Sequence, residues 1–389
     1  MKTPLLLLIA ALASPVFAQT NPVVKLNLIS PLDYQVFQRQ TPTSGEIIVE
    51  SILETTARGA LTNLDGLEAR LTGESASGEL PGNWQPLPFD NRVRRFRGEL
   101  TAPAGGWYQL EVRLLGDGTN VADVTVEHVG VGEIFVIAGQ SNAANHGETR
   151  QKAKNPLVVA FGNGHWQPAK DPEPGVTGKG GSFMPAFGDA MADRFKVPIA
   201  VVPIAVGATS VREWLPADTP VVAPPDTGRN VICVGSNSWV STGELFDRIT
   251  TVENEFGPHG FRAVLWHQGE SDSHEPPDRQ ITPATYRQYL QFVIRASREE
   301  AGWRVPWFVA QASYHNPEDQ GSPELRAAQK SLVTDGIALA GPDTDKLGPE
   351  YRQNSGKGIH FNARGLQLHG ELWAKLVGAW LAQQLAASR

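Results

Sequence analysis

One short stretch constrains the fold of this chain more than any other: the apolar run Ile134 to Ala138, followed by Gly139-Gln140-Ser141-Asn142. Most residues of the run favour β-structure, and the run is too short for a helix. Gly139 permits a sharp turn that lifts the next side chains clear of the strand end. Ligands of open α/β sheets bind at the carboxyl ends of the strands. The stretch therefore predicts a buried strand that delivers Ser141 to such an edge, although glycine-serine turns are also common in ordinary loops.

The first part of the chain has the pattern of a small β-sandwich. A chain of 389 residues exceeds the usual single core, so two domains are expected. Within residues 19–131, short β-rich runs alternate with turn clusters at a spacing typical of a sandwich. The runs are Val23 to Ile29, Glu46 to Ile52, Leu67 to Leu71, Phe96 to Leu100, Trp107 to Leu115 and Val121 to Val129.

The second part, residues 132–389, alternates strands with helices. Further apolar runs of strand length are Pro156 to Phe161, Ile199 to Ala205, Ala263 to Trp266, Trp307 to Ala312 and Ile337 to Ala340. Apolar residues recur at helical spacing within Thr285 to Glu299 and in the final segment around Leu372. Such alternation predicts right-handed βαβ units, and hence a mostly parallel sheet covered on both faces. The expected fold class is α/β, a three-layer α/β/α sandwich.

The N-terminus has the pattern of a secretory signal peptide. Met1-Lys2 is followed by an apolar run from Leu5 to Leu12 and by small residues up to Ala18. We therefore predict a signal peptide over residues 1–18 and a secreted or periplasmic protein. The apolar run is well short of the roughly 20 residues that span a bilayer, and no later segment is long enough, so membrane insertion is not expected.

Charge and cysteine content narrow the expected partners. The formal net charge is −7, and no long basic run is present, which argues against nucleic acid and anionic membrane surfaces. Cys233 is the only cysteine, so an intramolecular disulfide cannot form. We expect neither a metal nor an organic cofactor, because ligand clusters and phosphate-cradling glycine loops are missing from the sequence.

A serine hydroxyl becomes an effective nucleophile when a base, usually a histidine, takes its proton. His360 is the predicted base, because it follows the last predicted strand and precedes the C-terminal helix, where it can reach the edge that carries Ser141. His146, close to Ser141 in sequence, and His267, at the end of its own strand, are the rival candidates.

An oxyanion requires hydrogen-bond donors directed at it. The backbone N–H of Ser141, the N–H of Gly207 and the side-chain amide of Gln268 are the predicted donors, since each follows the end of a different strand. A turn glycine and a strand cap are the alternative roles of Gly207 and Gln268.

Two long stretches without periodicity, Gln167 to Ser182 and Pro216 to Thr242, are predicted loops. Long loops in compact domains are usually functional or mobile. Tryptophan rings stack on sugars, although most tryptophans belong to a core. Trp166 lies beside the first loop, and the predicted substrate-binding residues at the site are Asn142, Arg212, Trp214 and Trp239.

Together, Gly139-Gln140-Ser141-Asn142, Trp266-His267-Gln268-Gly269-Glu270, the lone Gly207 and the late His360 resemble the carbohydrate-esterase branch of the SGNH hydrolases. The similarity covers about residues 132–385 and is to sialate O-acetylesterases and acetylxylan esterases. It implies an SGNH-type sandwich with Ser141 as nucleophile, His360 as base, and Gly207 and Gln268 as oxyanion donors. The stretch Ala104 to Tyr108 also resembles the leading domain of sialate O-acetylesterases.

The chain departs from this pattern at Lys357, where the family commonly has an aspartate three residues before the histidine. A lysine cannot accept the imidazole hydrogen bond. The site is therefore either a Ser-His dyad or a triad with another acid. The candidate acids are Glu270 first, and then Asp272, Asp343 and Asp345.

The resemblance implies a serine carboxylic-ester hydrolase, an O-acetylesterase that acts on an acetylated polysaccharide or oligosaccharide, and the predicted signal peptide makes it an exported one. A lipase or thioesterase of the same fold is one alternative, and a non-catalytic carbohydrate-binding protein is another. The sequence leaves open whether the glycan is xylan, sialic acid or an algal polysaccharide, as well as the oligomeric state.

Overall fold

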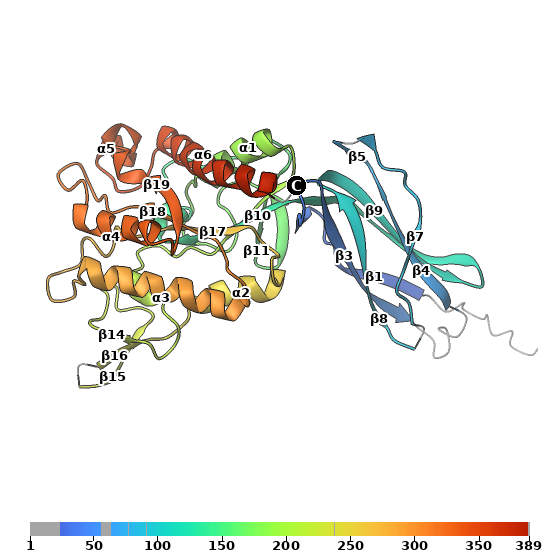
Figure 1. Ribbon diagram of the computed structural model, residues 1–389, viewed down its shortest axis with the longest axis horizontal. Coiled ribbons are helices and arrows are strands. Elements are labelled where there is room, and N and C mark those ends of the chain that lie inside the picture. Colours follow the sequence, from blue (N-terminus) through green and yellow to red (C-terminus); the bar gives the residue numbers. More distant parts are fainter. Residues whose placement is uncertain (1–23, 56–63, 77, 91, 237, 388–389) are drawn as a thin grey trace, which may run out of the picture.

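The computed structural model describes residues 24–55, 64–76, 78–90, 92–236 and 238–387. The predicted signal peptide lies outside these residues. A sheet-rich N-terminal part adjoins a larger mixed α/β part (Figure 1). This arrangement agrees with the α/β class predicted from the sequence.

The N-terminal part consists of two layers of strands around one apolar core. The first layer is antiparallel, in the order β1 (Val24–Ser30), β3 (Ser44–Thr55) and β8 (Arg95–Pro103). The second contains β4 (Leu64–Thr72), β7 (Gln85–Leu87), β9 (Gly105–Gly116) and the start of β10 (Thr119–Gly139), which also pairs with β2 (Gln35–Gln38). A small hairpin is formed by β5 (Glu74–Ser75) and β6 (Gly78–Glu79). Burial alternates along β8, so that Phe96 and Leu100 enter the shared core.

The long strand β10 connects the two parts. Its first half pairs with β9, and residues Glu133 to Gly139 pair with two strands of the second part. The predicted domain boundary after residue 131 falls within this strand. A Cβ atom at Gly132 would lie 1.9 Å from the carbonyl oxygen of Pro198, so the chains pass each other closely at this point.

The sheet of the second part has the order β12-β11-β13-β10-β17-β18-β19. Its strands besides β10 are β11 (Val158–Gly162), β12 (His165–Pro168), β13 (Ile199–Pro203), β17 (Ala263–His267), β18 (Trp307–Gln311) and β19 (Leu339–Asp343). All neighbours are parallel except the β11-β12 hairpin. Every residue of β13 and β17 is buried, which explains their continuous apolar sequences.

Helices cover both faces of this sheet (Figure 1). The side chains of Phe135 and Ile137 pack with α1 (Met184–Phe195) and α6 (Ala363–Ala387). The alternate residues Ile134 and Val136 belong to the opposite core, which contains α2 (Phe246–Phe256), α3 (Pro283–Ala301) and α4 (Pro323–Thr334). None of the helices in the described residues combines the length and apolar character needed to cross a membrane.

Short elements fill the connections at the carboxyl edge of the sheet. They are the 3-10 helices η1 (Ser141–Ala143), η2 (Val211–Trp214), η3 (Thr344–Lys346) and η4 (Pro349–Tyr351), and the single turn α5 (Gln353–Gly356).

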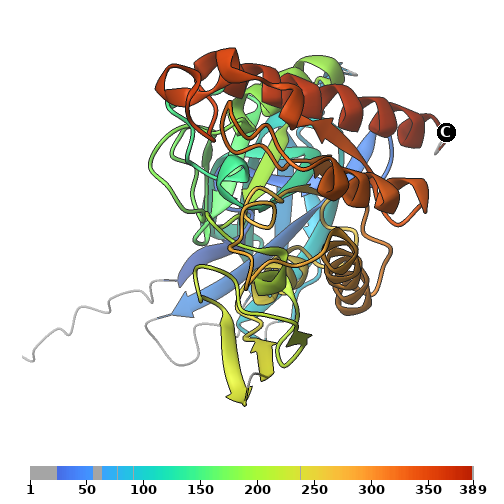
Figure 2. The same ribbon diagram turned by 90° about the vertical axis from the view of Figure 1, so that its left-hand side faces the viewer.

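The predicted loop Pro216 to Thr242 contains a small projecting sheet of β14 (Pro220–Val221), β15 (Val231–Gly235) and β16 (Ser238–Ser241), visible at the lower edge of Figure 2. The expectation of a plain loop was wrong at this point. The strands are too short to produce a clear alternation, and Ile232 and Val234 are 50% and 57% exposed rather than packed.

Candidate functional site

The turn after β10 places Ser141 at the carboxyl edge of the sheet. Gly139 has φ +126, and a Cβ atom there would lie 2.0 Å from the carbonyl oxygen of His267, so only glycine fits. The N–H of Gln140 donates to that same carbonyl at 2.9 Å. Ser141 then begins η1 and is 5% exposed. The local sequence therefore folds as predicted for the delivery of one serine.

The loop that carries His360 lies directly against the loop that carries Ser141. Asn142, the residue after the serine, donates from Nδ2 to the carbonyl oxygen of Ile359 at 3.4 Å. The backbone N–H of Glu148 donates to the carbonyl oxygen of Phe361 at 2.9 Å. In the described residues no hydrogen bond joins Ser141 to His360 itself. Catalytic hydrogen bonds often tighten only when substrate is bound, so the neighbouring positions suit a nucleophile and its base.

His146 links the predicted base to the loop of Gly207. The rings of His146 and His360 have their centroids 5.3 Å apart. A Cβ atom on Gly207 would lie 2.7 Å from Nε2 of His146, and the N–H of Gly207 donates to Oγ1 of Thr177 at 2.7 Å. Oγ1 of Thr177 also lies 3.1 Å from Nε2 of His146. Four segments that are distant in sequence thus meet at one edge. Thr177 was not among the predicted site residues, because its only signal in the sequence is its place in the loop Gln167 to Ser182.

His360 lies in a setting that keeps its imidazole neutral. Burial, together with the nearby His146 and Arg352, lowers the pKa of His360 from 6.5 to about 4. Its Nδ1 atom lies 3.0 Å from Nε2 of Gln353. A neutral imidazole at ordinary pH is the form that can accept a proton from a serine. The sequence carried no signal for Gln353, because it lies seven residues away in an irregular loop.

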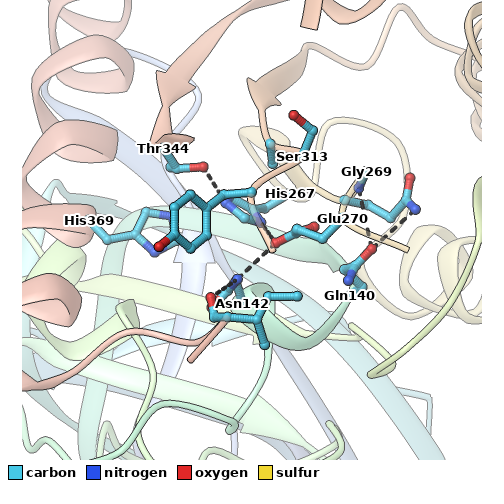
Figure 3. A network of polar contacts seen from close by, with 12 residues as sticks. Gln140, Asn142, His267, Gly269, Glu270, Ser313, Thr344 and His369 are labelled. Atoms are coloured by element: carbon cyan, nitrogen blue, oxygen red, sulfur yellow. Dashed lines mark hydrogen bonds and ion pairs between the residues drawn. The ribbon is translucent and has the colours of Figure 1, made fainter. Parts of the chain in front are cut away.

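Glu270, the first candidate acid, contacts Asn142 (Figure 3). Its Oε1 atom accepts a hydrogen bond of 2.8 Å from Nδ2 of Asn142 and lies 3.6 Å from Nδ1 of His267. Burial raises the pKa of Glu270, and the hydrogen bond from Asn142 opposes this rise. Within the described residues, no hydrogen bond or ion pair connects Glu270 to His360.

The three other candidate acids are engaged elsewhere. Asp272 accepts hydrogen bonds from Oγ of Ser210 at 2.6 Å and from the N–H of Val211 at 2.9 Å. Asp343 forms ion pairs with Arg326 and Lys346. Asp345 accepts from the N–H and Oγ of Ser313 and from the N–H of Tyr314.

His267, one rival base, lies inside the protein. Its Nε2 atom is 2.8 Å from Oγ1 of Thr344, and its ring packs on His369 at 4.8 Å between centroids (Figure 3). Burial lowers its pKa to about 3. Because His267 is 1% exposed, it cannot meet a substrate, whereas His146 lies beside His360.

The predicted role of Gln268 does not fit its geometry. The side chain is fully buried, and its Nε2 atom donates to Asp272 at 2.6 Å, to the carbonyl oxygen of Thr209 at 3.0 Å and to Gln140 at 3.2 Å. Both amide hydrogens of Gln268 are directed at these acceptors, so neither hydrogen points at an oxyanion beside Ser141. The reason is burial, because the fold turns this side chain inward, where Asp272 accepts its hydrogen bond.

The predicted substrate-binding residues divide into two pairs. Arg212 and Trp214 are fully buried, so neither side chain can contact a substrate and the prediction does not fit them. Arg212 forms an ion pair with Glu275 at 3.0 Å, while Nε1 of Trp214 donates to Thr209. Asn142 lies at the site, and Trp239 is partly buried in β16.

Trp166 packs against Phe161 and Phe256. The described residues contain no group of three or more His, Cys, Asp or Glu side chains placed to hold a metal ion.

Comparison with known proteins identifies the family of this chain and a solved structure with a similar fold. The family model described as "carbohydrate esterase, sialic acid-specific acetylesterase" matches residues 131–378. A solved carbohydrate acetylesterase from Xanthomonas citri is similar in fold, with a TM-score of 0.51, 17% identity, and coverage of 90% of this chain and 74% of that chain.

Two further solved structures show weaker similarity. A protein from Arabidopsis thaliana has a TM-score of 0.45 and 20% identity over 64% of this chain and 98% of that chain. A family two carbohydrate esterase from Clostridium thermocellum, in complex with cellohexaose, has a TM-score of 0.36 and 11% identity over 92% and 99% of the two chains. A search of curated proteins found no match.

Proposed function

We propose that this chain, which belongs to the carbohydrate esterase family of sialic acid-specific acetylesterases, hydrolyses acetyl esters on a glycan through a serine acyl-enzyme. The family supports an esterase activity on carbohydrate. We propose three further points: that the mechanism uses a serine nucleophile, that the group removed is acetyl, and that the fold is of the SGNH type.

The observation that carries the serine mechanism is the contact between two loops. Asn142 joins the carbonyl oxygen of Ile359, and so holds the segment of Ser141 beside the segment of His360. In the proposed reaction, Oγ of Ser141 attacks the acetyl carbonyl while Nε2 of His360 takes its proton. His360 then gives this proton to the departing sugar oxygen, and water hydrolyses the acetyl-enzyme by the same steps.

Backbone N–H groups supply the proposed oxyanion site. The N–H of Ser141 and the N–H of Gly207 lie in adjacent loops at the edge of the sheet. Oγ1 of Thr177 accepts the hydrogen bond of Gly207 at 2.7 Å, which is the place that a substrate oxygen would take. Thr177 must therefore release this N–H during turnover.

Two alternative functions predict different results in an activity assay. A lipase or thioesterase would hydrolyse long acyl esters faster than acetyl esters, and a carbohydrate-binding protein would release no acid at all. The experiment is a comparison of acid release from 4-nitrophenyl acetate, butyrate and octanoate, with O-acetylated sialic acid and acetylated xylan as natural-type substrates. Preference for acetyl esters on a sugar supports the proposal, whereas preference for octanoate contradicts it.

Export is a separate proposal that rests on the N-terminal sequence pattern. Sequencing of the mature N-terminus from the extracellular or periplasmic fraction tests it. A start at Gln19 is expected, and recovery of the intact Met1 terminus only in the cytosol contradicts export.

A further inference from the structure

The segment before His360 closes on itself around Gln353. The backbone N–H of Gln353 donates to the carbonyl oxygen of His360 at 2.8 Å, and the N–H of Gly358 donates to the carbonyl oxygen of Gln353 at 3.0 Å. Between them, Asn354 and Ser355 have positive φ values of 54° and 57°. Non-glycine residues occupy this region only when their surroundings hold them there, so the loop has a defined shape.

The side chain of Gln353 is held against the His360 ring. Its amide nitrogen lies 3.0 Å from Nδ1 of His360. A Cβ atom on Gly358 would lie 2.3 Å from Cγ of Gln353, so the absence of a side chain at Gly358 leaves the space that Gln353 fills. Among the described residues, Gln353 is the side chain hydrogen-bonded to Nδ1, and none of the candidate acids reaches that atom.

We propose that Gln353 is the positioning residue of His360 and takes the place that a carboxylate holds in a Ser-His-Asp site. The inference rests on the proposed function, because it presupposes that His360 is the base for Ser141. The proposed positioning group is thus a neutral amide, whereas the sequence left a Ser-His dyad or one of four acids as the alternatives.

The path of the serine proton determines which atom of the Gln353 amide must face His360. Nε2 of His360 can accept the proton of Ser141 only if the ring already carries its own proton on Nδ1. The amide nitrogen of Gln353 faces Nδ1 in the structure, and a half-turn of the amide places Oε1 there to accept Nδ1–H. This half-turn breaks no other side-chain hydrogen bond of Gln353 within the described residues. Nδ1 keeps its proton throughout, while the serine proton passes through Nε2 to the sugar oxygen.

The charges around His360 explain why an amide suffices. His146, whose ring centroid lies 5.3 Å from that of His360, and the nearby Arg352 both disfavour the imidazolium. Arg352 is fixed nearby by hydrogen bonds from its guanidinium to the carbonyl oxygens of Ile359, Leu347 and Thr344. A neutral acceptor fixes the tautomer without adding charge, so the base stays neutral at low pH.

Three variants of the full chain test the inference with an acetyl ester substrate. Gln353→Met keeps the volume and removes the hydrogen bond, Gln353→Glu supplies a carboxylate, and Gln367→Met is the matched control on α6, where the amide donates to Glu371 at the surface. We expect Gln353→Met to lower kcat about tenfold to a hundredfold with KM nearly unchanged, because the tautomer is no longer fixed. Gln367→Met should match the wild type.

Gln353→Glu gives the readout that a purely structural role would not move. A carboxylate at Nδ1 stabilises the imidazolium, so kcat should be retained while the acidic limb of kcat/KM moves to higher pH by about one unit or more. Histidine ¹⁵N NMR of the wild type should show the Nδ1–H tautomer of His360.

The outcomes separate this inference from the proposed function. Wild-type kcat in Gln353→Met, or an unmoved acidic limb in Gln353→Glu, overturns the role of Gln353, and the Nε2–H tautomer does so as well. If Gln353→Met fails to fold, the pH profile of Gln353→Glu decides alone. Undiminished turnover in Ser141→Ala instead overturns the serine mechanism, whatever the Gln353 variants show.

Discussion

The side-chain amide of Asn142 donates a hydrogen bond of 2.8 Å to the carboxylate of Glu270 (Figure 3). The most favoured acid of the sequence analysis therefore supports the residue after the nucleophile, while the ring of His360 meets Gln353. The same Asn142 amide reaches the carbonyl oxygen of Ile359. Glu270 thus acts on the relative position of the two loops rather than on the histidine directly.

Replacement of Glu270 tests this assignment. Glu270→Gln should lower kcat by less than about tenfold, because a glutamine oxygen still accepts from Asn142, whereas Glu270→Ala leaves a buried amide without its acceptor and should cost more. Steady-state kcat on an acetyl ester is the measurement, with the surface variant Glu371→Gln as control. A loss in Glu270→Gln as large as that in Ser141→Ala would show that the charge of Glu270 is required by the base.

The pH profile should reflect the lowered pKa of His360. The base must be neutral to accept a proton, so kcat/KM rises with pH through a pKa of about 4 and is lost below it. We expect activity to persist well below the ordinary histidine pKa of 6.5, with a half-maximal value near pH 4. Circular dichroism at each pH separates loss of the base from acid unfolding. A half-maximal value near 6.5 in a folded enzyme would contradict the described surroundings of His360.

Gly207 should tolerate no side chain. A Cβ atom would lie 2.7 Å from Nε2 and 3.0 Å from Cε1 of His146, in the cluster that borders His360. Gly207→Ala should therefore lower kcat about a hundredfold, through displacement of His146 and of the backbone donor. Gly235→Ala is the matched control, because a Cβ atom there has open space. Normal kcat in Gly207→Ala would remove this N–H from the proposed oxyanion site.

A buried charge cluster joins the two parts of the chain. Glu133, in the second half of β10, accepts hydrogen bonds from Arg39 and Arg262, both at 2.5 Å, and from Gln38 at 2.9 Å. Glu133→Gln should lower the free energy of unfolding by about 3–5 kcal/mol, because two cations lose their buried partner. Glu111→Gln, which removes the partly exposed pair with Arg70, should cost about 1 kcal/mol or less. Equal effects of the two substitutions in urea unfolding would contradict this role of Glu133.

The sequence predicted the features that depend on local pattern. The apolar strands, the turn at Gly139 and the long helices each follow from residues adjacent in sequence or one helical turn apart, and the structure contains them. His360 was predicted to reach the edge of the sheet that carries Ser141, because both residues come after parallel strands. In the structure the loops of these two residues are in contact.

The sequence could not predict features that depend on tertiary burial. Arg212 and Gln268 are polar side chains of the kind expected at a site, but the fold turns both inward and satisfies them with Glu275 and Asp272. The contact between Gln353 and His360 requires two residues with positive φ, for which Asn354 and Ser355 give no clear signal.

Acetate release from an O-acetylated oligosaccharide by Ser141→Ala, compared with the wild type, tests the central claim most directly. The account predicts that kcat falls by several orders of magnitude while circular dichroism and the melting temperature stay near wild-type values, since the nucleophile acts as a unit with its base. A variant that keeps more than about a tenth of the wild-type kcat would contradict Ser141 as the nucleophile, because losing a nucleophile costs far more than tenfold.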